Sequence, residues 1–482
     1  MDNNGERAEI TSKPKHIWRN FSLLLLIVVL TGFLAHSRNM SFSQVLAISL
    51  FTATVLGTLL FWSFRLSIAF VGIGILLATK TLDVENFVKF SSLDVICFLV
   101  GMMTIVGMLK DVGFFNWIMM KLIRGAKGSA TRFLTLLCVS STLLACLVDE
   151  VTSIIFIAAI ILEACDYFEV DPTPYIISSV LATNIGSSGT MLGNPIGILI
   201  GMRAGLTFES FIKWAFPVTM AALALTLLIL RIWYRKDLLL LGAKMKEKLS
   251  SAAGTAGPGT AKIENKKDFK IGISIFVATI LMIAFHHRIE VLCRFPQNTM
   301  LLAAPLIGAG VVMFWKAERA RHYIEKDVDW WTLIFFMMLF AKAGTLRYTG
   351  VTDILANKIV AFSGSNITIL IMIVLWISCF GSSILDNVVL VSAIIPVIQS
   401  FKAIGINVYP LWWALLFGGC FGGNITMVGS TANIVAIGML EKQGRKQMKF
   451  FRWFRIGATV GVISTAVAGL LLLILFPFMP KH

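Results

Sequence analysis

Apolar residues stand in long, nearly uncharged runs that recur from one end of the chain to the other. Runs of about 20 such residues are expected to cross a lipid bilayer as α-helices. Strands of a membrane β-barrel would alternate apolar and polar positions, which excludes that fold. We therefore predict an all-α polytopic membrane protein with about 11 spans plus two hairpins, and the pattern leaves open whether the hairpin arms span fully or re-enter. The predicted runs are residues 18–35, 43–62, 66–81, 94–110, 131–148, 151–164, 173–203, 209–234, 271–287, 298–315, 329–345, 367–385, 388–400, 408–439 and 451–477.

Two acids interrupt the run from Arg132 to Glu163, and charge indicates how this run is arranged. One straight helix of this length would extend about 48 Å, against about 30 Å of hydrocarbon. A turn at Asp149, with the N-terminus in the cytoplasm, places most of the 42 Lys and Arg residues on the cytoplasmic side, as the positive-inside rule requires. Topology thus explains the net charge of +16, and nucleic acid is not an expected partner.

The two halves of the chain repeat each other at an offset of about 236 residues. Leu147–Val151 echoes Ile384–Val388, and Thr190–Asn194 echoes Thr426–Ser430. Each copy would hold an odd number of crossings, so the second copy is predicted to be inverted, as in many secondary transporters. The predicted division is 1–42, cytoplasmic tail and first helix; 43–234, repeat 1 with hairpin 131–164 and broken helix 173–203; 235–270, cytoplasmic linker; and 271–482, repeat 2 with hairpin 367–400 and broken helix 408–439.

Three acids in the middle of apolar stretches, Asp149, Glu150 and Asp386, are candidate functional residues. A carboxylate surrounded by hydrocarbon is costly, so such residues usually face a cavity and mark an ion path. The alternative is an ordinary pair of spans whose turn lies in water. Recurrence of the same aspartate in the second copy favours the functional interpretation.

Two glycine-rich stretches, 184–195 and 422–430, interrupt predicted helices. Clustered Gly, hydroxyl and amide residues do not sustain a continuous helix. Pro195 suits the first turn of a restarted helix with Asn194 as its cap, and Ser430 suits the second cap. Freed carbonyls and hydroxyls suit Na⁺, whereas the start of a half-helix suits an anion. The alternative is close helix packing through Gly and Ser.

Other chemistry-bearing residues receive structural interpretations. The seven cysteines lack a CxxC pair, which favours small buried thiols over disulfides or a zinc site. Lys342, near the end of a span, is expected to snorkel to the membrane interface. The amphipathic segments 112–124 and 349–361 occupy matching positions in the two copies and are expected to lie in the interface.

These motifs resemble the ion transporter superfamily that includes the arsenite exporters (ArsB), the sodium/proton antiporters (NhaD) and the melanosomal P-protein, with a citrate-transporter-like domain. The resemblance rests on 149–152, 184–195, 385–387 and 422–433. It implies that each hairpin is re-entrant, that its tip faces the break of a discontinuous helix, and that the transport parts move against the scaffold like an elevator. Residues 193–197 depart from the Gly-Asp-Pro-Pro-Asn of many relatives, and Glu150 stands where Asn is common.

By this resemblance the two tip–break pairs form the binding site for substrate and coupling ion. No catalytic residues are predicted. Candidate binding residues are Asp149, Glu150, Thr152, Asn184, Gly186, Ser187, Ser188, Thr190, Asn194, Asp386, Asn387, Gly423, Asn424, Thr426, Ser430 and Asn433. The candidate Na⁺ ligands among them are Asp149, Ser187, Thr190, Asp386, Asn424 and Thr426.

The sequence therefore predicts a secondary active transporter, driven by H⁺ or Na⁺, that moves a small inorganic ion or solute. An efflux antiporter of the arsenite/antimonite or Na⁺ type is favoured over a sodium-coupled anion or carboxylate symporter and over a passive channel. An intramembrane aspartyl protease using Asp149 and Asp386 is a further alternative, but Glu150 and the glycine breaks have no role in it. No enzymatic activity is expected.

We expect no cofactor beyond the coupling ion, H⁺ or Na⁺. The expected partners are the solute and the lipid bilayer. A homodimer is compatible with the sequence, and so is association with a separate ATPase, because the chain itself contains no Walker A motif. The expected location is the inner membrane of a bacterium.

Overall fold

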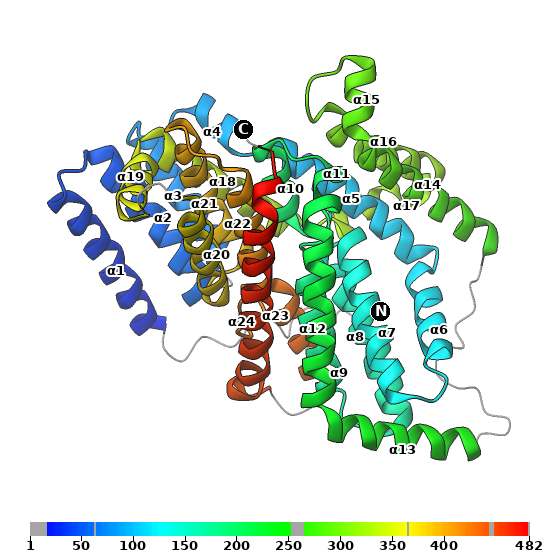
Figure 1. The fold of residues 1–482 in the computed structure, drawn as a ribbon. Helices are drawn as coiled ribbons and strands as arrows, with labels where there is room; N and C mark the ends of the chain where they lie inside the picture. Colours follow the sequence, from blue (N-terminus) through cyan, green and yellow to red (C-terminus); the bar gives the residue numbers. More distant parts are fainter. Residues whose placement is uncertain (1–16, 62–63, 252–264, 364–365, 443–447, 481–482) are drawn as a thin grey trace. The chain divides into compact units, whose positions relative to one another are not determined.

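The computed structural model describes residues 17–61, 64–251, 265–363, 366–442 and 448–480, and within these ranges it contains helices and no strand (Figure 1). The prediction of an all-α protein is confirmed. The helices are α1 (Ile17–Ser37), α2 (Phe42–Leu60), α3 (Arg65–Ala78), α4 (Val84–Phe90), α5 (Leu93–Asp111), α6 (Phe114–Ala126), α7 (Ala130–Leu147), α8 (Glu150–Phe168), α9 (Thr173–Gly186), α10 (Pro195–Ala204), α11 (Phe208–Ser210), η2 (Phe211–Ala215), α12 (Phe216–Trp233), α13 (Arg235–Ser251), α14 (Lys266–Ala284), α15 (His286–Cys293), α16 (Thr299–Trp315), α17 (Ala317–His322), η3 (Tyr323–Asp327), α18 (Trp330–Tyr348), α19 (Val351–Ser363), α20 (Ile367–Ile384), α21 (Asn387–Ala403), α22 (Tyr409–Gly422), α23 (Thr431–Lys442), α24 (Phe450–Leu475) and η4 (Phe476–Phe478).

Eight helical segments in the described part of the chain are long and apolar enough to cross a membrane. The pair α14 and α15, bent by 63° at its junction, raises the number to as many as nine. Several other apolar helices are shorter, among them α3, α6 and α16, and three that follow a predicted break or tip: α10, α21 and α23. The chain is therefore an integral membrane protein. The predicted total number of spans and the predicted inversion of the second repeat stay predictions.

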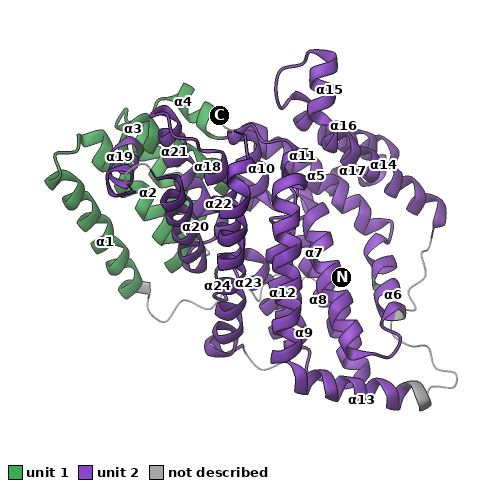
Figure 2. Cartoon of the chain, in the orientation of Figure 1, with its two compact units in different colours: residues 1–91, 334–352 green, residues 92–333, 353–482 purple. Residues whose placement is uncertain are grey.

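The described residues form two compact units (Figure 2). Unit 1 comprises the chain up to Ser91 together with 334–352, and unit 2 comprises 92–333 and 353 onward. These units divide the chain by contacts in space, whereas the boundaries of the two repeats were drawn along the sequence and stay a prediction. The candidate residues of both tips and both breaks belong to unit 2.

In unit 1 the prediction for Lys342 is wrong. Its side chain is 1% exposed instead of reaching an interface. The amine donates to Thr54 Oγ1 at 2.5 Å and to the Ile68 carbonyl at 3.4 Å. Gly72 has no side chain at the place that the amine occupies. The lysine is buried because neighbouring helices supply acceptors and room for it, which its own sequence position does not reveal.

In unit 2 the chain turns back at Asp149, as predicted. α7 ends at Leu147, α8 begins at Glu150, and the two helices pack side by side (Figure 1). Asp149 Oδ1 accepts from the backbone N–H groups of Val151 and Thr152 at 2.8 and 2.9 Å, which caps α8. A single straight helix through this region is thereby excluded.

Candidate functional site

The first predicted break lies between α9 and α10. α9 ends at Gly186, whose Cα lies against the backbone of Thr142 in α7, so closely that a side chain would not fit. α10 restarts at Pro195, and Asn194 Oδ1 caps it by accepting from the Gly197 N–H at 2.8 Å. Glycine thus permits the close approach of two backbones, and the Asn-Pro pair starts the new helix.

The second break lies between α22 and α23 and repeats this construction. Gly422, at the end of α22, lies against the backbone of Cys379 in α20. Ser430 Oγ accepts from the Ala432 N–H at 3.2 Å at the start of α23. Within each break a threonine hydroxyl donates to a carbonyl near the end of the helix before the tip, Thr190 to that of Cys146 and Thr426 to that of Ser383.

The two tips meet through Glu150 and Asn387. Glu150 is 3% exposed and Asn387 is 2% exposed. Glu150 Oε1 accepts from Asn387 Nδ2 at 3.3 Å and from Ser430 Oγ at 3.5 Å. Its other oxygen, Oε2, is buried without a hydrogen-bond partner among the described residues. A buried carboxyl oxygen without a partner is uncommon, because buried polar atoms are usually hydrogen-bonded.

Three buried asparagines join the two breaks. Asn184 Nδ2 in α9 donates to the Oδ1 atoms of Asn424 and Asn433, both at 2.8 Å. Asn433 Nδ2 in turn donates to the carbonyls of Gly423 and Thr426 at 2.8 and 2.9 Å. Asn184 Oδ1 is buried and has no partner within the described ranges. One amide oxygen therefore remains available between the breaks.

A third set of contacts completes the arrangement. Asn194 Nδ2 donates to Ser187 Oγ at 3.0 Å and lies 3.2 Å from the Cys420 sulfur in α22. Ser187 Oγ donates to the Asn184 carbonyl at 2.9 Å and also lies close to the Glu150 carboxyl. We call the connected residues the polar cluster: Glu150, Asn184, Ser187, Asn194, Asn387, Cys420, Asn424, Ser430 and Asn433.

The other predicted site residues lie around this cluster with partners of their own. Asp149 and Asp386 each cap the helix that follows them, and they share no hydrogen bond with each other in the described structure. Ser188 Oγ contacts Thr219 Oγ1 on α12 at 2.8 Å, away from the cluster. The predicted Na⁺ ligands are thus divided among several local networks. The local contacts of the first tip and break involve Thr152, Gly186 and Thr190. Those of the second break involve the carbonyls of Gly423 and Thr426, which accept from Asn433.

Sequence reasoning missed two polar neighbours of the site. Cys420 occupies the position that corresponds to Asn184 at the repeat offset, so the repeat itself could have identified it. Thr431 Oγ1 donates to Asp386 Oδ2 at 2.9 Å, and its counterpart at the same offset is Pro195. Both escaped notice because their residue types differ between the copies.

The chemistry of the site is acidic and rich in amides. The described contacts of the polar cluster involve no Lys, Arg or His side chain. No group of three or more His, Cys, Asp or Glu that could hold a metal ion occurs among the described residues. Amide oxygens, hydroxyls and one carboxyl are ligands for hard cations and for hydroxylated solutes.

Two interrupted helices and two capped tips around a buried polar cluster, in an all-helical membrane protein, define a membrane transporter. The sequence model of the citrate transporter family, CitMHS, matches residues 58–418. The chain belongs to this family, and the predicted resemblance to the ion transporter superfamily is confirmed.

Curated relatives agree with this assignment. The uncharacterized transporters Rv2684 and Rv2685 of Mycobacterium tuberculosis are 30% and 31% identical, and each alignment covers 79% of this chain and 85% of the relative. The P protein of Homo sapiens is 25% identical over 81% of this chain and 54% of its own length. Among solved structures, the YdaH transporter of Alcanivorax borkumensis has a TM-score of 0.56 at 16% identity, covering 84% of this chain and 89% of that chain, which shows a shared fold.

Proposed function

We propose that this transporter is a secondary active antiporter in which Glu150 binds the coupling cation, H⁺ or Na⁺, and the two breaks bind the solute. The observation that carries the proposal is the setting of Glu150, whose side chain is buried. Its Oε1 accepts hydrogen bonds from Asn387 and Ser430 of the other half, and its Oε2 has no hydrogen-bond partner among the described residues. A carboxylate at this depth is costly without a proton or a cation. The same carboxyl can therefore release its cation when the solute is exchanged.

The charge of the cluster supports an uncharged or cationic solute. Asp149, Glu150 and Asp386 all belong to the tips, whereas no basic side chain enters the described contacts. A free anion would be repelled there. Arsenite and antimonite, which are uncharged hydroxides near neutral pH, can exchange hydrogen bonds with amides and hydroxyls, and Na⁺ suits the open oxygen of Asn184. Export of one of these is the favoured activity.

The description of the matching family as citrate transporters supports a second candidate, cation-coupled carboxylate symport. With the acids of the tips nearby, a carboxylate substrate would have to enter together with compensating cations. Transport would then fail without the accompanying cation, and this dependence separates the second candidate from the first. A passive channel, the third candidate, would conduct without any coupling gradient.

An elevator-like motion and a bacterial inner membrane complete the proposal. The amphipathic helices α6 and α19 correspond to the segments expected to lie in the interface and connect the moving parts to the rest. Mycobacterial transporters at 30% and 31% identity support the location.

The test is flux into proteoliposomes containing the purified chain, with H⁺ and Na⁺ gradients imposed separately or collapsed, using arsenite, Na⁺ and citrate as probes. We expect Glu150→Gln to reduce gradient-driven flux by about 100-fold, the effect of about 2.7 kcal/mol. Glu163→Gln, which changes an exposed carboxyl on the same helix, is the matched control and should leave flux unchanged. Full gradient-driven flux in well-folded Glu150→Gln protein would exclude the proposed role of this carboxyl.

A further inference from the structure

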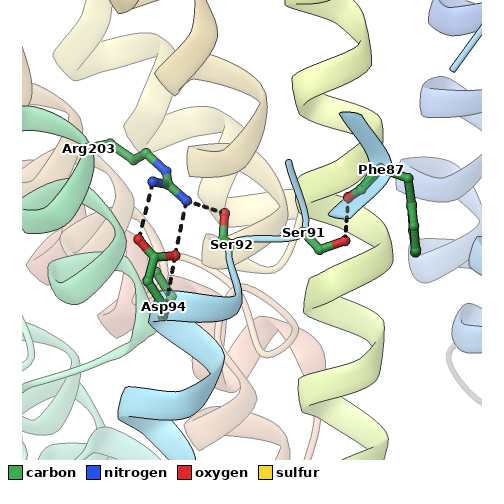
Figure 3. Close-up of polar contacts among 6 residues, drawn as sticks. Phe87, Ser91, Ser92, Asp94 and Arg203 are labelled. Carbon is green, nitrogen blue, oxygen red and sulfur yellow. Dashed lines mark hydrogen bonds and ion pairs between the residues drawn. The ribbon is translucent and has the colours of Figure 1, made fainter. Parts of the chain in front are cut away.

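Helix α10 connects the polar cluster to a second polar contact at its other end. Its cap, Asn194, donates to Ser187 and lies against Cys420. In its last turn, Arg203 makes two hydrogen bonds to Asp94, from Nη1 to Oδ2 at 3.3 Å and from Nη2 to Oδ1 at 3.2 Å (Figure 3). One helix of 10 residues, about 15 Å long, therefore joins the first break to α5.

The ends of the two helices suit this contact electrostatically. Asp94 lies in the first turn of α5, where the helix dipole favours a negative charge, and Arg203 lies in the last turn of α10, where it favours a positive one. Arg203 Nη2 also donates to Ser92 Oγ at 2.6 Å, just before α5 (Figure 3). The guanidinium is thus held by three acceptor atoms in one short stretch of chain.

The packing of unit 2 makes α10 a bridge. α5 packs against α14 and α16, which also pack on each other. α10 packs against α21 and α22, which carry the second tip and the second break, and it touches α5 as well. The contact between α10 and α5 consequently joins two groups of helices: α5, α14 and α16, which lie outside the polar cluster, and α10, α21 and α22, which adjoin it.

The ion pair is exposed enough to open. The side chains of Arg203 and Asp94 are 28% and 39% exposed. Ion pairs at such positions stabilise a structure only slightly, because water and salt screen them. A contact of this kind suits a reversible connection better than a permanent clamp.

We propose that the Asp94–Arg203 ion pair is a latch, which holds α10 and the cap of the first break in place and opens whenever the polar cluster opens. Asp94 and Arg203 are positioning residues, since they act on the site through α10. The inference rests on the proposed function only in taking the polar cluster as the binding site.

The test follows Cys420, a thiol of the cluster that is 1% exposed and lies beside Asn194. The full-length chain, in proteoliposomes, carries Cys97→Ser and Cys293→Ser to remove the two exposed thiols. The rate at which N-ethylmaleimide modifies each remaining cysteine is read by peptide mass spectrometry. Cys138, buried in α7 against α9, is the internal reference.

We expect Asp94→Asn and Arg203→Gln each to raise modification of Cys420 by about threefold to fivefold, as for loss of a half-exposed pair. The double variant should add nothing further, because both changes remove the same interaction. Arg203→Lys should restore part of the protection. Asp268→Asn, the matched control, removes the Asp268–Lys316 pair, which is 2.6 Å long and similarly exposed, and should have no effect.

The latch is overturned if Cys420 reacts no faster in Asp94→Asn, if Asp268→Asn has the same effect, or if Cys138 accelerates equally, which would indicate general loosening. The labelling requires no transported solute. If flux survives in Glu150→Gln protein, the proposed function is excluded and the labelling result for the latch still stands. If flux is lost in Glu150→Gln protein but Cys420 labelling is unchanged in Asp94→Asn protein, only the latch is excluded.

Discussion

The two halves of the site have the same frame and different chemistry. In both, a glycine at the end of a long helix lies against the backbone of the helix before the tip, and a threonine hydroxyl reaches a carbonyl at the end of that helix. In both, an aspartate caps the helix after the tip. The paired residues are Gly186 and Gly422, Thr190 and Thr426, and Asp149 and Asp386.

The side chains that line the cluster differ at the corresponding positions. The first half has the acid and the second half supplies an amide donor to it. The differing pairs are Glu150 and Asn387, Asn184 and Cys420, Ser187 and Gly423, and Asn194 and Ser430. Backbone geometry requires the same residue types at the three paired positions of the frame. The side chains that line the cluster are not under this backbone constraint, and they differ between the two copies. If the polar cluster binds the solute as proposed, we expect specificity to depend on these asymmetric positions.

The largest expected effect comes from breaking the frame. A Cβ at Gly186 would lie 2.6 Å from the Thr142 Cα, and one at Gly422 would lie 2.7 Å from the Cys379 Cα, so two backbones would have to separate. We expect Gly186→Ala and Gly422→Ala each to destabilise the fold by about 3 kcal/mol or more. Thermal unfolding of purified protein, followed by size-exclusion chromatography, measures this.

Gly438→Ala is the matched control for these substitutions. Gly438 lies in α23 and has nothing within 4 Å of the added Cβ, so alanine there should be neutral or slightly stabilising. Normal melting of Gly186→Ala together with collapse of Gly422→Ala would show that the two frames are not equivalent.

The frame was predictable from the sequence because its signals are local. Glycine clusters inside apolar runs, and an aspartate between two such runs, indicate breaks and turns from intrinsic chain properties alone. The turn at Asp149 and the restart at Pro195 accordingly lie where the pattern places them.

The remaining features depend on partners distant in the sequence. Lys342 is buried by Thr54 and Ile68, which no pattern around the lysine reveals. The pairing of Asn184 with Asn424 and Asn433 requires the two halves to pack together, and so does the contact of Glu150 with Asn387. Residue types predicted which positions are polar, but only tertiary packing determines which atoms meet.

A second prediction makes the lining more symmetric. Asn387→Asp replaces the donor that lies 3.3 Å from Glu150 Oε1 with another carboxyl. Like charges at this separation repel, so we expect the initial rate of gradient-driven flux to fall by about tenfold, equivalent to about 1.4 kcal/mol. Flux into proteoliposomes under the conditions described for Glu150→Gln measures it.

Asn407→Asp is the control, because it adds the same charge outside the polar cluster, where Asn407 Oδ1 accepts from the Tyr409 N–H at the start of α22. A negative charge at a helix start is favourable, so this variant should transport normally. An equal loss of flux in both variants would indicate a general effect of added charge and would exclude a specific role for the contact between Asn387 and Glu150.

The smallest expected effect concerns the two aspartates. Asp386 Oδ2 accepts from Thr431 Oγ1 at 2.9 Å, whereas Pro195 at the corresponding position offers no hydroxyl to Asp149. Thr431→Val should therefore make the second tip resemble the first and destabilise the protein by about 1 kcal/mol through loss of one hydrogen bond. Thermal unfolding measures the change, and Thr459→Val, which removes only a bond to the preceding turn of α24, should alter it far less. An unchanged melting temperature in Thr431→Val would mean that water replaces the hydroxyl, and the second tip would then be as solvated as an ordinary turn.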